Sequence, residues 1–214
     1  MRIMVMSDEE ASYIWDHYNK EIFQDVDFIL SAGDLKPEYL EYVVTLSSKP
    51  LFYIHGNHDE KYSTKPPEGC FCIEDDIVEY QGIRILGLGG SMRYRKGLYQ
   101  YNEKQMQWRI RRLWLKLRSY GGFDILLTHA PAAGFHDAED LCHQGFAVFN
   151  ELLEKYQPKY HIHGHIHMNY GTKAPRVSQN MYTTVINAYR YYSFAYNETE
   201  AEAEQTLSVS QADQ

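Results

Sequence analysis

The sequence predicts an α/β protein with mixed sheets, and two observations carry this prediction. Short apolar, β-branched runs recur along the chain, and each ends in polar residues or glycine. Segments with helical periodicity lie between several of these runs, so strands and helices alternate through the first half of the chain. Such alternation is typical of parallel βαβ units. We expect one domain over residues 1–196 and an acidic, disordered C-terminal tail over 197–214.

Nine runs carry the strand pattern, namely 3–6, 28–31, 51–54, 77–80, 83–88, 125–128, 160–163, 183–187 and 191–196. The pair that flanks Gln81 and Gly82, and the last two runs, are expected to form antiparallel edges. Helices are predicted over 9–24, 37–47, 102–118 and 145–156. Pro37 suits a first helical turn, and the apolar residues of 145–156 recur every three to four positions.

The composition excludes several classes of protein. Hydrophobic residues make up 44% and charged residues 23% of the 214 residues, which excludes fibrous, low-complexity and fully disordered proteins. The net charge of −8 is uneven, because every charged residue of 197–214 is acidic. The rest of the chain is mildly acidic, and we expect no broad basic surface on it, so long nucleic acids are disfavoured as partners.

The cysteine pattern and the apolar runs bear on location. Cys70, Cys72 and Cys142 are odd in number and form no C-x-x-C pair, which argues against a disulfide framework. We therefore expect a reducing, cytoplasmic compartment. No apolar run approaches the roughly 20 residues that a membrane span needs, so no membrane partner is expected. The apolar run at 3–6 is too short for a signal peptide.

Polar side chains follow the predicted strands at the points where the strands end. In α/β sheets, ligands bind in the crevice beyond the carboxyl ends of the strands. Five segments that are distant in sequence therefore deliver carboxylate, amide and imidazole groups to one edge. Seven of these side chains are candidate metal ligands, namely Asp8, Glu10, Asp34, Asn57, His129, His165 and His167.

This donor set suits two divalent ions. Oxygen and nitrogen donors favour Mn, Fe, Co, Ni or Zn, and the lack of thiolates argues against a structural zinc site. Two ions ~3.5–4 Å apart clamp a phosphoryl group and lower the pKa of a water between them. Taken singly, each residue has a structural explanation, such as a helix cap at an aspartate or a turn at Gly56-Asn57. Their order and their shared edge favour the metal centre.

The order of the motifs resembles that of the calcineurin-like metallophosphoesterase superfamily. The motifs are Asp8-Glu9-Glu10, Gly33-Asp34, Gly56-Asn57-His58-Asp59, a lone His129 after a strand, and Gly164-His165-Ile166-His167. The resemblance spans residues 3 to 190 and implies a four-layer α/β/β/α sandwich with two metals between the sheets. It implies that one metal takes Asp8, Asp34 and His167, and that the other takes Asp34, Asn57, His129 and His165.

The resemblance also implies a metal-dependent phosphoester hydrolase. A hydroxide activated by the two metals would attack phosphorus, His58 would assist the departing oxygen, and Asp59 would orient His58. The expected partner is a small phosphorylated substrate, whether a monoester, a diester such as a cyclic nucleotide, or a pyrophosphate. A nuclease and an interaction module with decayed catalysis are the alternatives.

Glu10 departs from the family pattern, which has Asp-x-His where this chain has Asp8-Glu9-Glu10. In an extended segment, residues two apart point the same way, so Glu10 can still face the metal together with Asp8. A carboxylate ligand favours Mn²⁺ over Zn²⁺, so we expect Mn²⁺, with Fe, Ni or Zn as alternatives. If Glu10 does not ligate, the first metal site is weakened, as the interaction module requires.

Two arginines, one loop and several histidines lie outside the family motifs. Arg93 and Arg95 follow an apolar run and a Gly-Gly-Ser loop, and they are candidate substrate contacts because arginine pairs bidentately with phosphate. The basic residues of 104–118 are interpreted as the outer face of an amphipathic helix. Residues 131–143 form either a solvated loop or a lid that faces the substrate. No metal role is assigned to His17, His55, His136 or His143, and a strand or supporting position is expected for His161 and His163.

Overall fold

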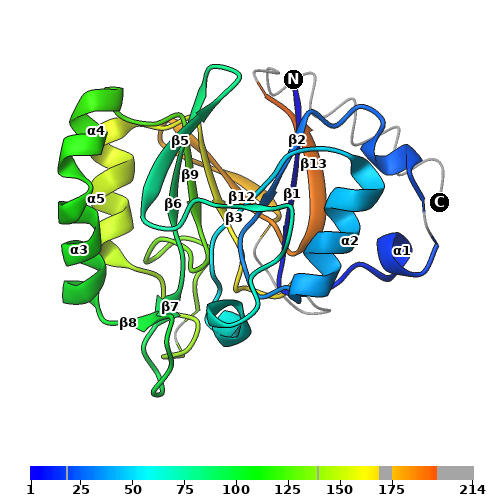
Figure 1. Ribbon diagram of the computed structural model, residues 1–214. Helices are drawn as coiled ribbons and strands as arrows, with labels where there is room; N and C mark the ends of the chain where they lie inside the picture. The colour runs from blue at the N-terminus through cyan, green and yellow to red at the C-terminus, as the bar shows by residue number, and fades with distance from the viewer. Residues whose placement is uncertain (18, 139, 169–174, 197–214) are drawn as a thin grey trace.

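The computed structural model describes residues 1–17, 19–138, 140–168 and 175–196. Two β-sheets stack face to face, and helices cover both outer sides (Figure 1). This arrangement confirms the predicted α/β fold with two mixed sheets in a four-layer α/β/β/α sandwich. The predicted tail over 197–214 lies outside the described residues.

The first sheet has parallel strands and one antiparallel edge. In spatial order it contains β13 (Arg190–Ala195), β1 (Arg2–Ser7), β2 (Phe28–Ser31), β3 (Leu51–Tyr53) and β4 (Phe71–Cys72). Strands β1 to β4 are parallel, and β13 runs antiparallel to β1 with Arg2 opposite Ala195. An antiparallel edge at the last strand is confirmed, although its partner is the N-terminal strand.

The second sheet has four parallel strands between two antiparallel edges. In spatial order it contains β11 (Val177–Asn180), β12 (Thr183–Asn187), β10 (Tyr160–His163), β9 (Ile125–Thr128), β6 (Ile83–Leu88) and β5 (Asp76–Tyr80). The hairpin from β5 to β6 turns at Gln81 and Gly82, where φ is 50° and 79°, as two-residue hairpins require. A separate pair joins β7 (Ser91–Met92) to β8 (Gln100–Tyr101).

Helices flank the two sheets on opposite sides. Figure 1 shows α1 (Ser12–Trp15) and α2 (Pro37–Ser47) outside the first sheet, and α3 (Glu103–Arg112), α4 (Trp114–Tyr120) and α5 (Ala147–Tyr156) outside the second. Two short 3-10 helices are η1 (Glu21–Phe23) and η2 (Asp59–Ser63). Among the described residues, no helix has the length and apolar character needed to cross a bilayer.

Two helix predictions were wrong in extent. The segment 9–24 forms α1 and η1 rather than one helix, because Asn19 Oδ1 accepts a hydrogen bond from Glu21 N–H and begins a new turn. The segment 102–118 breaks at Leu113, which ends α3 and precedes α4, and its N–H bonds to Ile110 O in a tighter turn.

Apolar strand residues fill the space between the sheets. Val5 and Leu30 of the first sheet belong to one buried cluster with Leu127 and Ile162 of the second. Two further apolar clusters lie under the outer helices. Parallel strands that are covered on both faces have continuous apolar sequences, which is why these strands could be predicted from the sequence. Polar groups are left to the strand ends, where the candidate site forms.

Candidate metal centre

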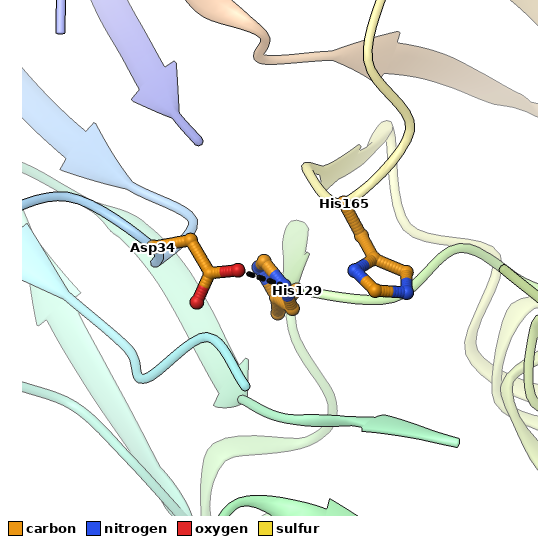
Figure 2. Close-up of side chains that lie close together, drawn as sticks. All are labelled: Asp34, His129 and His165. Atoms are coloured by element: carbon orange, nitrogen blue, oxygen red, sulfur yellow. Dashed lines mark ion pairs between the residues drawn. The ribbon is translucent and has the colours of Figure 1, made fainter. Parts of the chain in front are cut away.

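Loops after five parallel strands meet at the carboxyl edge of the two sheets. Asp8 follows β1, Asp34 follows β2, Asn57 follows β3, His129 follows β9 and His165 follows β10. The sheets are joined here, because His129 Nε2 lies 3.3 Å from Asp34 Oδ2 and 3.0 Å from Asn57 Oδ1. Figure 2 shows Asp34, His129 and His165 gathered at this edge. The structure therefore brings these sequence-predicted residues together.

The backbone at this edge is held in unusual conformations. Asp8, Asp34 and His165 have φ of 66°, 59° and 66°, in the left-handed region that costs energy for residues with a side chain. Gly56 cannot be replaced without movement, because a Cβ there would lie 2.1 Å from Asp34 Oδ1. A Cβ on Gly164 would lie 2.7 Å from Ser7 Oγ. The glycines of the sequence motifs are thus required by close approach of the loops.

Asp34, His129 and His165 form a candidate cation site. Each offers one ligand atom, and these atoms lie within 4.8 Å of one another. The other ring nitrogen of each histidine faces a backbone carbonyl, with His129 Nδ1 2.8 Å from Ala32 O and His165 Nε2 2.5 Å from Cys142 O. Since a carbonyl only accepts, His129 Nδ1 and His165 Nε2 carry protons. This leaves Nδ1 of a neutral His165 as an acceptor, whereas His129 Nε2 faces the oxygens of Asp34 and Asn57 and becomes an acceptor only when a cation displaces its proton. Imidazoles that ligate metals are held in this way.

The charges of the cluster suit a bound cation. Burial opposes ionisation of Asp34, but the adjacent His129 outweighs it and lowers the pKa of the carboxyl to about 2. Burial lowers the pKa of His129, but Asp34 outweighs this and raises it to about 9. Burial lowers the pKa of His165 to about 3 and raises the pKa of Asp8. Metal ligation needs an ionised aspartate and neutral histidines, so Asp34 and His165 are already in the required forms, whereas a cation would have to displace a proton from His129.

Asp8 and His167 extend the cluster on its open side. Both carboxylate oxygens of Asp8 accept from the N–H of His165 at 2.9 Å, and Oδ1 lies 3.8 Å from His167 Nε2. The side chain of His167 is 52% exposed and its ring stacks on Tyr189. Glu10 lies nearby in sequence, but its Oε1 pairs with Lys36 Nζ at 3.1 Å. The structure therefore brings Asp8 and His167 together and directs Glu10 towards a lysine.

His58 and Asp59 have separate surroundings. The N–H of His58 donates to Asp34 Oδ1 at 2.7 Å, and its exposed ring faces Arg95, with Nδ1 3.1 Å from Nη2. Asp59 Oδ2 accepts from the N–H groups of Gly56 and Asp34 at 2.7 and 2.8 Å. Its burial, together with the charge of Asp34, raises its pKa to about 7. The carboxylate thus joins two backbone loops, whereas the sequence pattern led us to expect it against the His58 ring.

The two candidate arginines differ in their contacts. Arg93 donates from Nη2 to Gln100 O at 3.2 Å and to Gln105 Oε1 at 3.0 Å, so its guanidinium braces the loop between β7 and β8. The guanidinium of Arg95 instead lies beside His58 and is exposed. Of the two, Arg95 is placed to meet an anion at the centre.

Sequence reasoning missed a buried ion pair behind the site. Glu74 accepts from the N–H groups of His55 and Gly89, each at 2.9 Å, and it pairs with Arg109 of α3. Arg109 is only 6% exposed, so the interpretation of its helix face as solvated was wrong for this residue. Its spacing from the buried Met106 and Ile110 was the signal, because these positions share one face. Glu74 thereby holds the chain just before the Gly56-Asn57 turn.

The segment 131–143 contacts the centre near its C-terminal end, at Cys142 and His143. The carbonyl of Cys142 contacts His165, and the ring of His143 lies 5.3 Å from that of His165, centroid to centroid. Glu139, within this segment, lies outside the described residues. His161 and His163 are buried in β10, and burial lowers the pKa of both imidazoles.

A comparison with known families decides the assignment. The family model described as calcineurin-like phosphoesterase matches residues 1–169, which include the whole candidate centre. The chain belongs to this family. Calcineurin-like phosphoesterases typically bind divalent metals, and Asp34, His129 and His165 form a candidate site for them.

Relatives and solved structures agree with the family and the fold. The chain is 26% identical over 190 residues to Metallophosphoesterase domain-containing protein 1 of Homo sapiens, covering 87% of this chain and 49% of that protein. It is 28% identical over 143 residues to UPF0046 protein T07D4.2 of Caenorhabditis elegans, covering 64% of this chain and 34% of that protein. The chain thus spans half or less of these two relatives.

A solved structure resembles the chain over most of its length. The crystal structure of TT1561 of Thermus thermophilus matches with a TM-score of 0.57 and 16% identity, covering 87% of this chain and 88% of that one. At this level of identity the likeness shows a common fold, and the chemistry has to be argued from the residues of this chain.

Proposed function

We propose that this calcineurin-like phosphoesterase hydrolyses small phosphoesters with two divalent metal ions. The observation that carries the proposal is the cluster of Asp34, His129 and His165, in which backbone carbonyls hold both imidazoles and each residue offers one ligand atom within 4.8 Å of the others. When bound, the ions would supply a Lewis acid for the phosphoryl oxygens and lower the pKa of a water.

The donors divide into two sets that share Asp34. Asn57, His129 and His165 complete one set, because the Asn57 amide oxygen lies 3.0 Å from His129 Nε2 at the buried side. Asp8 and His167 complete the other set on the open side. Glu10 would join this second set directly or through water after leaving Lys36. The oxygen-rich second set favours a hard ion, which supports Mn²⁺.

His58 would donate a hydrogen bond to the departing oxygen and stabilise the charge that develops on it. Its backbone N–H is anchored by Asp34, which holds the residue beside the ligands while its ring stays exposed. Arg95 donates to Nδ1, so in the neutral ring the proton lies on Nε2, and Nε2–H is the donor. A positioned hydrogen-bond donor of this kind contributes about 10²–10³ in rate. Arg95, with further donors on its guanidinium, would bind the phosphoryl oxygens.

A panel of aryl phosphomonoesters, phosphodiesters, a cyclic nucleotide and a pyrophosphate tests the proposal, assayed with Mn²⁺, Fe²⁺, Ni²⁺ and Zn²⁺. We expect turnover with Mn²⁺ and a loss of about 10²-fold or more in both Asp34→Asn and His58→Ala. His17→Ala, which removes an exposed histidine of the loop after α1, is the matched control and should keep full activity.

Three outcomes would overturn the proposal. If no ester is hydrolysed with any of the metals, the result would favour the alternative of an interaction module with decayed catalysis. The pairing of Glu10 with Lys36 is the observation that supports this alternative. Activity that survives Asp34→Asn would come from a contaminating enzyme or another site. Salt-sensitive attack on single-stranded DNA in preference to small esters would instead favour a nuclease.

A further inference from the structure

A second group of metal-binding side chains lies in the loop between β9 and α5. Asp140, Cys142 and His143 each present one ligand atom, and these atoms lie within 4.8 Å of one another. Cys142 Sγ lies 2.7 Å from Asp140 Oδ1 and 3.3 Å from His143 Nδ1. His143 Nδ1 lies 2.8 Å from Asp140 Oδ1. This group, which we call the loop triad, shares no residue with the centre described above.

The loop triad has the donors of a zinc site with an open position. A thiolate, an imidazole and a carboxylate bind Zn²⁺ in preference to hard ions such as Mg²⁺ or Mn²⁺. Three protein ligands leave a fourth position for water or another ligand. Asp140 is exposed, and Cys142 and His143 are half-buried, so a cation can reach all three. We propose that the loop triad binds one Zn²⁺-like cation separately from the Asp34 centre.

The loop triad touches the Asp34 centre through His165. The carbonyl of Cys142, on the same residue as the ligating sulfur, lies 2.5 Å from His165 Nε2. The rings of His143 and His165 are 5.3 Å apart, centroid to centroid. A cation on the triad would therefore fix the carbonyl that holds the His165 ring. Binding to the triad does not depend on catalysis, whereas this effect on His165 rests on the proposed function.

Cobalt titration of the full chain separates the two sites. Co²⁺ bound to a thiolate gives sulfur-to-metal charge-transfer absorption in the near ultraviolet, and the set of Asp34, His129 and His165 contains no sulfur. We expect the amplitude of this band at saturation to correspond to one thiolate-bound Co²⁺ per chain, and Zn²⁺ to remove it by competition. Cys142→Ser should abolish the band, and His143→Ala should weaken Co²⁺ affinity about tenfold or more.

Two variants act as controls. Cys72→Ser removes an exposed thiol of β4 and should keep the band. Asp34→Asn damages the proposed catalytic centre and should also keep it, which makes this result independent of any hydrolase assay. The proposal is overturned if no band forms, if the band survives Cys142→Ser, or if Asp34→Asn removes it. Circular dichroism of each variant shows whether a lost band results from unfolding. If Cys142→Ser does not fold, the lowered Co²⁺ affinity expected of His143→Ala provides the second test.

Discussion

Arg95 and His58 meet at the open side of the candidate centre, with Arg95 Nη2 3.1 Å from His58 Nδ1. Arginine can only donate, so this contact makes Nδ1 the acceptor and leaves the proton of a neutral His58 on Nε2. The two side chains come from different loops, one after β3 and the other after β7. One contact therefore orients the proposed Nε2–H donor of His58 and places a guanidinium beside it.

Replacing Arg95 with alanine should lower kcat/KM about 10- to 100-fold on the best ester of the panel. A hydrogen bond to a charged group is worth about 1.5–3 kcal/mol, and each 1.4 kcal/mol is a factor of ten. The kcat/KM of Arg95→Lys should lie between those of the wild type and Arg95→Ala, because lysine keeps the positive charge but lacks the planar guanidinium that binds two oxygens at once. Steady-state kinetics measure the effect, with the adjacent exposed Lys96→Ala as control. An Arg95→Ala enzyme equal to the Lys96→Ala enzyme would remove Arg95 from the site.

Chelation of the metals should destabilise the wild-type protein and spare Asp34→Asn. A ligand at 100 times its Kd stabilises the folded state by about 2.7 kcal/mol, which corresponds to about 5–10 °C in Tm for a chain of this size. Calorimetry with Mn²⁺ and then with excess EDTA measures the shift. Asp16→Asn, at an exposed turn, should behave as wild type. An equal EDTA shift in Asp34→Asn would place the bound metal elsewhere.

Changing Glu10 to histidine should move metal preference from Mn²⁺ towards Zn²⁺. The change restores the family's Asp-x-His pattern and exchanges a hard carboxylate for an imidazole, which is a better ligand for zinc. It also releases Lys36, whose Nζ lies 3.1 Å from Glu10 Oε1. Competition between the two metals, followed by metal analysis of the protein, gives the ratio. Lys36→Ala controls for loss of the ion pair, and an unchanged ratio in Glu10→His would show that residue 10 does not approach the metal.

The strands and the centre were predictable for one physical reason. Strands buried on both faces require continuous apolar runs, and ligands at their carboxyl ends require polar residues at once afterwards. The change from apolar to polar at Asp8, Asp34 and His129 is therefore visible in the sequence alone. The loop positions with positive φ are less visible, since Asp34 and His165 adopt that conformation without being glycine.

The contacts between elements could not be predicted in the same way. Asp59 lies against the backbone of Asp34, and Glu74 against Arg109, because two loops and a helix approach one another in the folded chain. Neither pair is close in sequence, and a charged residue on a helix is usually exposed. The loop triad was missed for a related reason, since Asp140, Cys142 and His143 match no common zinc motif.

Acid should weaken the fold through Glu74. Burial raises the pKa of this carboxyl, but its bonds to His55 and Arg109 outweigh burial and lower the pKa from 4.5 to about 2. A group with a lowered folded-state pKa stabilises the protein above its unfolded pKa, and the contribution is lost as pH falls through the folded pKa. The Glu74 contribution should therefore be complete above pH 4.5 and disappear towards pH 2.

Replacing Glu74 with glutamine should remove this pH dependence and destabilise the protein at neutral pH. The free energy of unfolding should fall by about 1–3 kcal/mol, because Arg109 would lose its more buried counter-charge and keep only Asp75. Urea unfolding at several pH values measures both effects. The difference between wild type and Glu74→Gln should shrink as pH drops from 4.5 to 2, while Glu79→Gln, on an exposed position of β5, should follow wild type. A constant difference across that range would show that Glu74 does not carry the acid sensitivity, because its protonation would then leave the stability unchanged.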